Sequence, residues 1–189
     1  MAAAGLVEIR HGGRTRVREF RSSAGLDLLP RLLVARDGSV DAEVANGLME
    51  LRACLGTDAA RRCAEGGSDG ARLRLTQTAE AMAVAGDDMA ALASLDLEFW
   101  EAVVDGAGNI AYRLAFNGMR QTYEPIGELL RDVLAPELND HAGRRVIVAA
   151  ILAGDGPAAA AAARLLAIGE AAVSRLLATL ASPPEGTTS

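Results

Sequence analysis

The chain has 189 residues, is 50% hydrophobic and carries a formal net charge of −6. This length supports one hydrophobic core with a small appendage. No apolar run reaches the roughly 18 residues of a membrane span, and no apolar leader segment follows the start. These features argue against the membrane and secreted classes and predict a cytoplasmic protein.

Charge is divided unevenly along the chain. Seven arginines and three acidic residues give residues 1–36 a net charge of +4, whereas twelve arginines and 22 acidic residues give residues 37–189 a net charge of −10. An acidic surface repels nucleic acid, so any DNA contact is expected from the N-terminal arm. Charge alone is equally consistent with arginines that only keep a surface hairpin soluble.

Residues 1–20 predict a small basic β-hairpin. Two arms of alternating residue types flank a turn at Gly12-Gly13, where adjacent glycines can adopt the positive φ angles of a tight hairpin. Such a hairpin resembles the wing of a winged helix-turn-helix, which lies along DNA phosphates. The helices that precede a wing lie outside this sequence, so we expect the tail of a truncated DNA-binding domain. The residues predicted to contact the DNA backbone are Arg10, His11, Gly12, Gly13, Arg14 and Arg16.

Helical periodicity dominates the rest of the chain. Residues 21–43 form a leucine-rich connector that suggests a short helix or docking segment, and from residue 44 apolar residues recur at spacings of three and four. Asp87 is the expected N-cap of the third helix, and Pro125 is the expected bend in the fourth. The helices are predicted at 44–65, 71–85, from Asp87 to about 105, 109–134, 140–153 and 157–181.

These elements predict an all-α fold, an antiparallel bundle of six or seven helices preceded by the short N-terminal β-hairpin. Polar and small residues after the last helix predict a frayed end. The expected boundaries are 1–20 for the hairpin, 21–43 for the connector, 44–182 for the helical domain and 183–189 for a disordered tail.

Five short motifs, each weak alone, follow one another in an order typical of one family. They are the hairpin sequence and the segments Leu48–Ala64, Leu95–Trp100, Gly106–Asn109 and Val146–Asp155. In this order they resemble GntR-type transcription regulators of the FadR subgroup, which carry an all-helical FCD effector domain. The resemblance covers nearly the whole chain. It implies that residues 44–182 bind an effector and dimerise.

The resemblance also raises the question of a metal. Many FCD domains hold a divalent cation with one aspartate and three histidines, and Asp96 stands in the aspartate position. Trp100 and Arg144 occupy two of the histidine positions, the third falls near Leu166, and no histidine follows His141. Even if His141 supplied one ligand, the set would fall short of the three that such metals need. We therefore expect no metal and no other cofactor.

Without a metal, Asp96 needs another cation if it is buried, because an unpaired carboxylate in an apolar bundle is costly. The resemblance places Arg144 opposite it, so we predict an ion pair; the alternative is a solvated helix position. Arg52 either binds a ligand carboxylate through both nitrogens or is an exposed arginine. Asn109 is either a ligand contact or a helix N-cap. The predicted ligand-binding residues are Arg52, Asp96, Trp100, Asn109 and Arg144.

The predicted function is that of a ligand-responsive transcriptional regulator, a repressor, which forms a homodimer and binds DNA through the full-length protein. Its effector is expected to be a small molecule, an organic acid for instance. No catalytic motif is visible, so no catalytic residue is predicted and a small-molecule enzyme is the weakest alternative. A helical dimerisation or antagonist module without a ligand is the other. A deep pocket favours effector sensing, and a solid core favours the scaffold.

Overall fold

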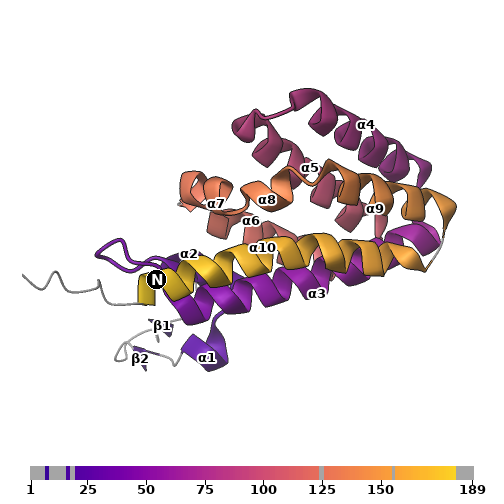
Figure 1. Ribbon diagram of the computed structural model, residues 1–189. Coiled ribbons are helices and arrows are strands. Elements are labelled where there is room, and N and C mark those ends of the chain that lie inside the picture. Colours follow the sequence, from indigo (N-terminus) through magenta and orange to yellow (C-terminus); the bar gives the residue numbers. More distant parts are fainter. Residues whose placement is uncertain (1–6, 9–15, 18–19, 124–125, 155, 182–189) are drawn as a thin grey trace, which may run out of the picture.

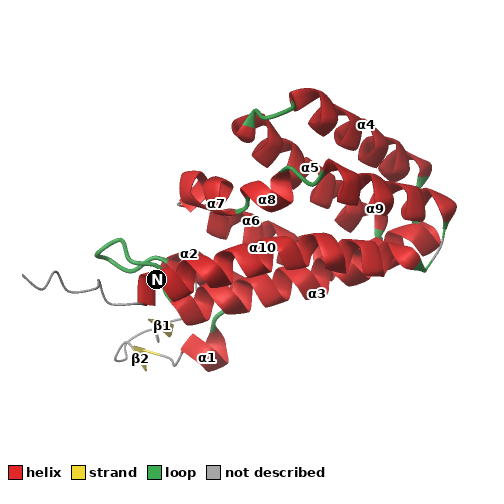
Figure 2. Cartoon of the chain, in the orientation of Figure 1, coloured by secondary structure: helices red, strands yellow, loops and turns green. Residues whose placement is uncertain are grey.

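The computed structural model describes residues 7–8, 16–17, 20–123, 126–154 and 156–181, which form mostly helices (Figures 1 and 2). The predicted all-α bundle is confirmed, but the predicted number of six or seven helices is wrong, because the described residues between Ala42 and Ala181 form eight. None of the described helices is long and apolar enough to cross a membrane. The helical elements are α1 (Phe20–Ser23), the 3-10 turn η2 (Leu26–Leu28), α2 (Leu29–Leu33), α3 (Ala42–Gly66), α4 (Asp69–Ala85), α5 (Met89–Gly106), α6 (Ile110–Tyr123), α7 (Gly127–Val133), α8 (Ala135–Leu138), α9 (His141–Ala153) and α10 (Pro157–Ala181).

Two very short strands precede the bundle, β1 (Val7–Glu8) and β2 (Arg16–Val17). They pair in antiparallel fashion, with Val7 opposite Val17 and Glu8 opposite Arg16. The segment between them lies outside the described residues, and so does the predicted tail at 183–189. The wing therefore stays a prediction. The predicted DNA contacts that fall in the undescribed segment are Arg10, His11, Gly12, Gly13 and Arg14.

The two longest helices, α3 and α10, lie side by side and run in opposite directions (Figure 1). Each has 25 residues. In the second layer α4 packs on α5, and α9 contacts α3, α4 and α10. Apolar side chains fill the space between the layers, because each helix turns one apolar face inward. The most deeply buried include Ala59, Leu92, Phe99, Val103, Ile147, Ile151 and Leu165.

Side-chain caps mark the starts of the long helices. Asp41, Ser68 and Asp140 each accept a hydrogen bond from a backbone N–H at the start of α3, α4 and α9. Such bonds satisfy N–H groups that have no partner inside the helix. The predicted cap at Asp87 is wrong by one residue. Asp88 accepts from two N–H groups in the first turn of α5 instead.

The single helix predicted over 109–134 is also wrong. The chain forms α6 and α7 in this region, and the four-residue α8 follows directly. Pro125, the predicted bend, lies outside the described residues. The division has a structural consequence, because short helices can turn the chain around one end of the bundle. Side chains from α6, α7 and α8 thereby reach the same cavity.

Gly56 in α3 offers a test of the packing between the layers. A Cβ atom there would lie 2.7 Å from Leu166 Cδ1 and 3.1 Å from Trp100 Cζ3, and both side chains are buried. Gly56→Ala should therefore lower the free energy of unfolding by about 1–3 kcal/mol through overpacking. Chemical denaturation measures the change.

Gly47 in the same helix is the matched control, because nothing lies within 4 Å of its Cβ position. Gly47→Ala should raise the free energy of unfolding by about 0.5–1 kcal/mol, since alanine is the better helix former. A Gly56→Ala variant as stable as Gly47→Ala would contradict the close approach of α3, α5 and α10.

Candidate functional site

A buried ion pair joins α5 to α9. Arg144 Nη2 donates to Asp96 Oδ1 at 2.5 Å, and the two residues are 1% and 6% exposed. Arg144 Nη1 donates to the backbone carbonyl oxygens of Glu137 and Leu138, at 2.7 and 3.1 Å. The predicted pairing of Asp96 with Arg144 is confirmed, and the alternative of a solvated Asp96 is wrong.

A second buried pair joins α3 to α8. Arg52 donates through both terminal nitrogens to the two carboxylate oxygens of Glu137, with Nη1 to Oε2 at 2.9 Å. Glu137 is fully buried. Gly169 of α10 makes room for it, because a Cβ atom there would lie 2.0 Å from Glu137 Oε2. The two-nitrogen contact predicted between Arg52 and a ligand carboxylate is thus made by a carboxylate of the chain itself.

The two pairs form one cluster, the buried quartet of Arg52, Asp96, Glu137 and Arg144. Arg52 Nη2 lies 3.8 Å from Asp96 Oδ2, which links them. Burial raises the pKa of Glu137, and the Arg52 guanidinium opposes this. Burial alone would lower the pKa of Arg52, and the Glu137 carboxylate reverses the effect and raises it. With two cations and two anions the quartet is electrically balanced, which a buried cluster requires.

A cavity of about 270 Å³, here called the polar cavity, opens beside the quartet. Arg52 and Asp96 of the predicted site line it. Arg144 is absent from its wall, because its terminal nitrogens point to Asp96 and to backbone carbonyls. The side chains around the polar cavity come from α3, α5, α6, α7, α8 and their connections, and are Arg52, Ala93, Asp96, Leu97, Arg120, Tyr123, Gly127, Leu130, Arg131, Leu134 and Leu138.

Trp100 and Asn109 occupy other places. Trp100 lines a smaller cavity of about 30 Å³, which shares Arg52, Asp96, Leu97 and Tyr123 with the polar cavity. Its indole packs edge-on against Phe99, with ring centroids 5.6 Å apart. Asn109 lines neither cavity, and its side-chain oxygen accepts from the N–H of Ala111 at the start of α6. That bond agrees with the helix-cap interpretation of Asn109.

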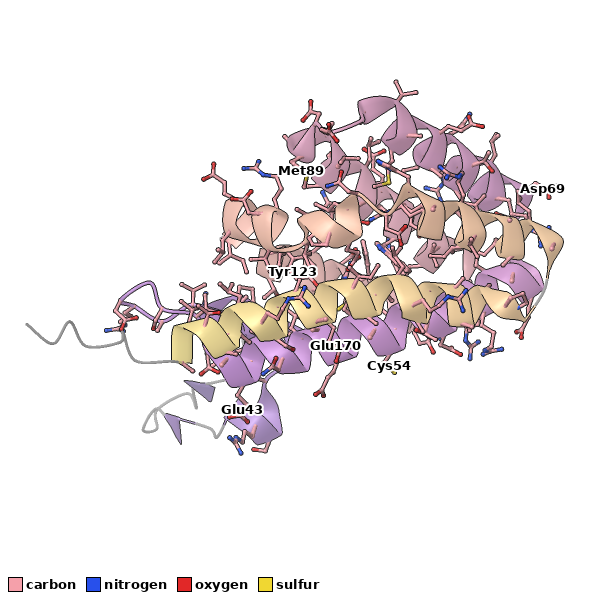
Figure 3. The ribbon with its side chains drawn as sticks, in the orientation of Figure 1. Glu43, Cys54, Asp69, Met89, Tyr123 and Glu170 are labelled. Carbon is pink, nitrogen blue, oxygen red and sulfur yellow. The ribbon has the colours of Figure 1, made fainter. Side chains whose placement is uncertain are left out.

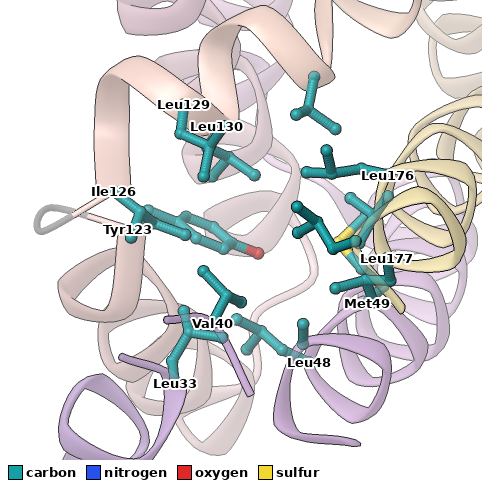
Figure 4. A pocket seen from close by; sticks show the side chains of 14 residues that line it. Leu33, Val40, Leu48, Met49, Tyr123, Ile126, Leu129, Leu130, Leu176 and Leu177 are labelled. Carbon is teal, nitrogen blue, oxygen red and sulfur yellow. The ribbon is translucent and has the colours of Figure 1, made fainter. Parts of the chain in front are cut away.

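Tyr123 belongs to the aromatic residues that the sequence concentrates between 99 and 123, a cluster that is usually core but can also line a ligand cavity. Tyr123 is the last residue of α6 and lines the polar cavity together with Arg52 of α3 and Leu138 of α8 (Tyr123 is labelled in Figure 3). It also lines a small cavity that is otherwise wholly apolar, into which its hydroxyl points (Figure 4). The hydroxyl is buried and has no hydrogen-bond partner among the described residues. Burial raises the pKa of Tyr123 to about 12, so the hydroxyl stays protonated.

Glu137 is a site residue that the sequence does not predict. It lies in the four-residue α8, which is too short for any apolar periodicity to reveal which side faces inward. A weak signal was present, since the carboxylate directly follows Pro136 at a helix start. That signal does not distinguish a buried acid from an exposed first-turn acid.

The quartet does not fit a divalent cation. Asp96 Oδ1 is already held by the Arg144 guanidinium, and the neighbouring Trp100 and Leu166 side chains, which pack against Gly56, offer no metal-binding atom. No group of three or more His, Cys, Asp or Glu side chains in the described residues has the arrangement of a metal site. Transition metals of this type need at least three such ligands.

Comparison with known proteins agrees with this architecture. Residues 47–167 match the FCD domain. The HTH-type transcriptional regulator Mce2R of Mycobacterium tuberculosis is 37% identical over 182 residues, which cover 96% of this chain and 74% of that protein. The fatty acid metabolism regulator protein of an Enterobacter species is 32% identical over 127 residues, covering 67% and 51%. The structure of Streptococcus agalactiae GntR has the same fold, with a TM-score of 0.57, 24% identity and coverage of 90% and 76%.

The chain therefore belongs to the GntR family of transcriptional regulators and carries their FCD domain. Its relatives are regulators rather than enzymes. In regulators of this family the FCD domain implies effector binding and dimerisation.

Removal of Asp96 should leave Arg144 as an unpaired buried cation. Asp96→Ala is expected to lower the free energy of unfolding by about 3–5 kcal/mol. The control is Glu65→Ala, which removes one ion-pair partner of Arg61. The Glu65 side chain is 59% exposed. This change should cost under about 1 kcal/mol, because exposed pairs are weak. Similar losses for the two variants in urea denaturation would mean that the quartet adds no more than a surface pair.

Tyr123 predicts a loss of stability at alkaline pH. Its pKa of about 12 in the folded chain exceeds the ordinary value of about 10. Above pH 10 the unfolded chain releases this proton and the folded chain retains it, so stability should fall as the pH rises toward 12, by roughly 2 kcal/mol. Tyr123→Phe should remove this part of the pH dependence, while Tyr112 remains in both proteins. Identical alkaline curves for wild type and variant in chemical denaturation would refute the assignment.

Proposed function

We propose that this chain is the effector-sensing part of a ligand-responsive repressor of the FadR subgroup, and that the polar cavity is its effector site. The observation that carries the proposal is a cavity of about 270 Å³ whose wall includes Arg52 and Asp96 of the charged, buried quartet. Pockets of this size with a few convergent polar groups are the usual sites of small ligands. A module that only dimerises has no need of such a pocket.

The remaining parts of the proposal follow from the family. The chain acts as a homodimer through residues 44–182, because such regulators bind paired half-sites. Residues 1–20 form the wing, and Arg16 is one of the wing residues that contact the DNA backbone. Base reading belongs to a recognition helix that precedes a wing, so this chain alone binds DNA weakly. In-frame translation of the upstream DNA tests this point, and the lack of any helix-turn-helix there would favour the antagonist alternative.

A panel of small organic acids tests the effector site. Thermal unfolding of the chain should shift upward, in a saturable way, with at least one acid, since a ligand that binds only the folded state stabilises it. Ala93→Phe places a ring in the polar cavity and should abolish the shift. Ser94→Phe on the exposed side of α5 is the matched control and should keep it. No shift with any acid, or a shift that survives in Ala93→Phe, would contradict the proposed site.

We also propose that sensing takes place without a metal, with Arg144 supplying the positive charge beside Asp96. Elemental analysis of the purified chain should give far less than one zinc, nickel or manganese per chain. A chelator should leave the unfolding temperature unchanged, because no folding free energy comes from metal binding. One stoichiometric transition metal per chain would overturn this part of the proposal.

A further inference from the structure

The charged side chains that line the polar cavity differ in whether they already have a buried partner. Arg52 and Asp96 of the quartet form what is here called the inner end of the cavity. At the inner end, each guanidinium of the quartet already has a carboxylate partner, Glu137 for Arg52 and Asp96 for Arg144. A further carboxylate placed against the quartet would leave a net negative charge away from water. Such an uncompensated buried charge is strongly unfavourable.

Two other arginines line the cavity, and neither is paired with a buried carboxylate among the described residues. Arg120 of α6 is exposed and makes no ion pair with a described residue. Arg131 of α7 has one weak contact, 3.8 Å to Asp132, whose side chain is 77% exposed. Apart from the quartet, Arg120 and Arg131 are the charged side chains that line this cavity. They form a local positive region on a chain whose net charge is −6.

The walls between the arginine pair and the quartet are largely apolar. They are formed by Ala93 and four leucines, Leu97, Leu130, Leu134 and Leu138. Tyr123 adds an uncharged ring to this wall, and its hydroxyl points into the separate apolar cavity (Figure 4). This part of the cavity therefore suits an uncharged, largely apolar body.

We propose that the effector is a small organic anion held with its charged group at Arg120 and Arg131 and its uncharged body directed inward toward the quartet. The inference rests on the proposed function of the polar cavity and adds the orientation and charge class of the ligand. Arg120 and Arg131 then determine specificity for an anion, and the balanced quartet rejects a second charge at the inner end.

Three probes of matched length test this orientation by isothermal titration calorimetry: hexanoate, hexan-1-ol and adipate. Hexanoate should bind the chain, and hexan-1-ol should bind about tenfold more weakly, because it lacks the charge that the two arginines recognise. Adipate should also bind about tenfold or more weakly than hexanoate, because its second carboxylate would meet the quartet. The single tryptophan, Trp100, beside the cavity provides a second readout by fluorescence.

Variants locate the anion. Arg120→Gln and Arg131→Gln should each weaken hexanoate binding, and the double variant should bind hexanoate and hexan-1-ol equally. Arg145→Gln on α9 is the control, since Arg145 is exposed and does not line the cavity. Adipate binding as tightly as hexanoate, or hexanoate binding unchanged in the double variant, would overturn the orientation and leave the effector site standing. If none of the three probes binds the wild-type chain, the orientation fails, and the acid panel then decides separately whether the effector site fails too.

Discussion

Four charged side chains can share a helical core only if their charges balance. Arg52, Asp96, Glu137 and Arg144 meet this condition and come from four different helices, so the balance also joins α3, α5, α8 and α9. Loss of any one partner leaves a charge that the apolar surroundings cannot solvate. The glycine at position 169 and the backbone carbonyls of α8 that Arg144 contacts are parts of the same arrangement.

The quartet also supplies the positive charge beside Asp96 from within the chain. A guanidinium beside Asp96 supplies positive charge where a cation would otherwise be needed, and it is always protonated. Glu137 occupies the donors of Arg52 that a ligand carboxylate would use. Arg120, which makes no ion pair with a described residue, and Arg131, whose one contact is with the exposed Asp132, lie elsewhere on the cavity wall.

The sequence predicts the long helices and the Asp96–Arg144 pair of the quartet, for separate reasons. Apolar spacing is a property of long helices, so α3, α4, α5, α9 and α10 are recognisable within a few residues. The Asp96–Arg144 pair is predictable because the resemblance to the family places Arg144 opposite Asp96. Glu137 and the break between α6 and α7 are not predictable in this way, because α8 is too short for periodicity and the path of the chain there depends on tertiary packing. Whether Tyr123 is core or cavity wall depends equally on distant helices.

A double-mutant cycle on Asp96 and Arg144 tests the central claim most directly, with both residues replaced by apolar side chains of similar size, Asp96→Leu and Arg144→Met. If Asp96 and Arg144 stabilise the fold mainly because each neutralises the buried charge of the other, each single variant loses much of its stability. The double variant then recovers a large part of that loss. The coupling free energy from urea denaturation should then be about 2 kcal/mol or more. Additive losses, with a coupling near zero, would contradict the account.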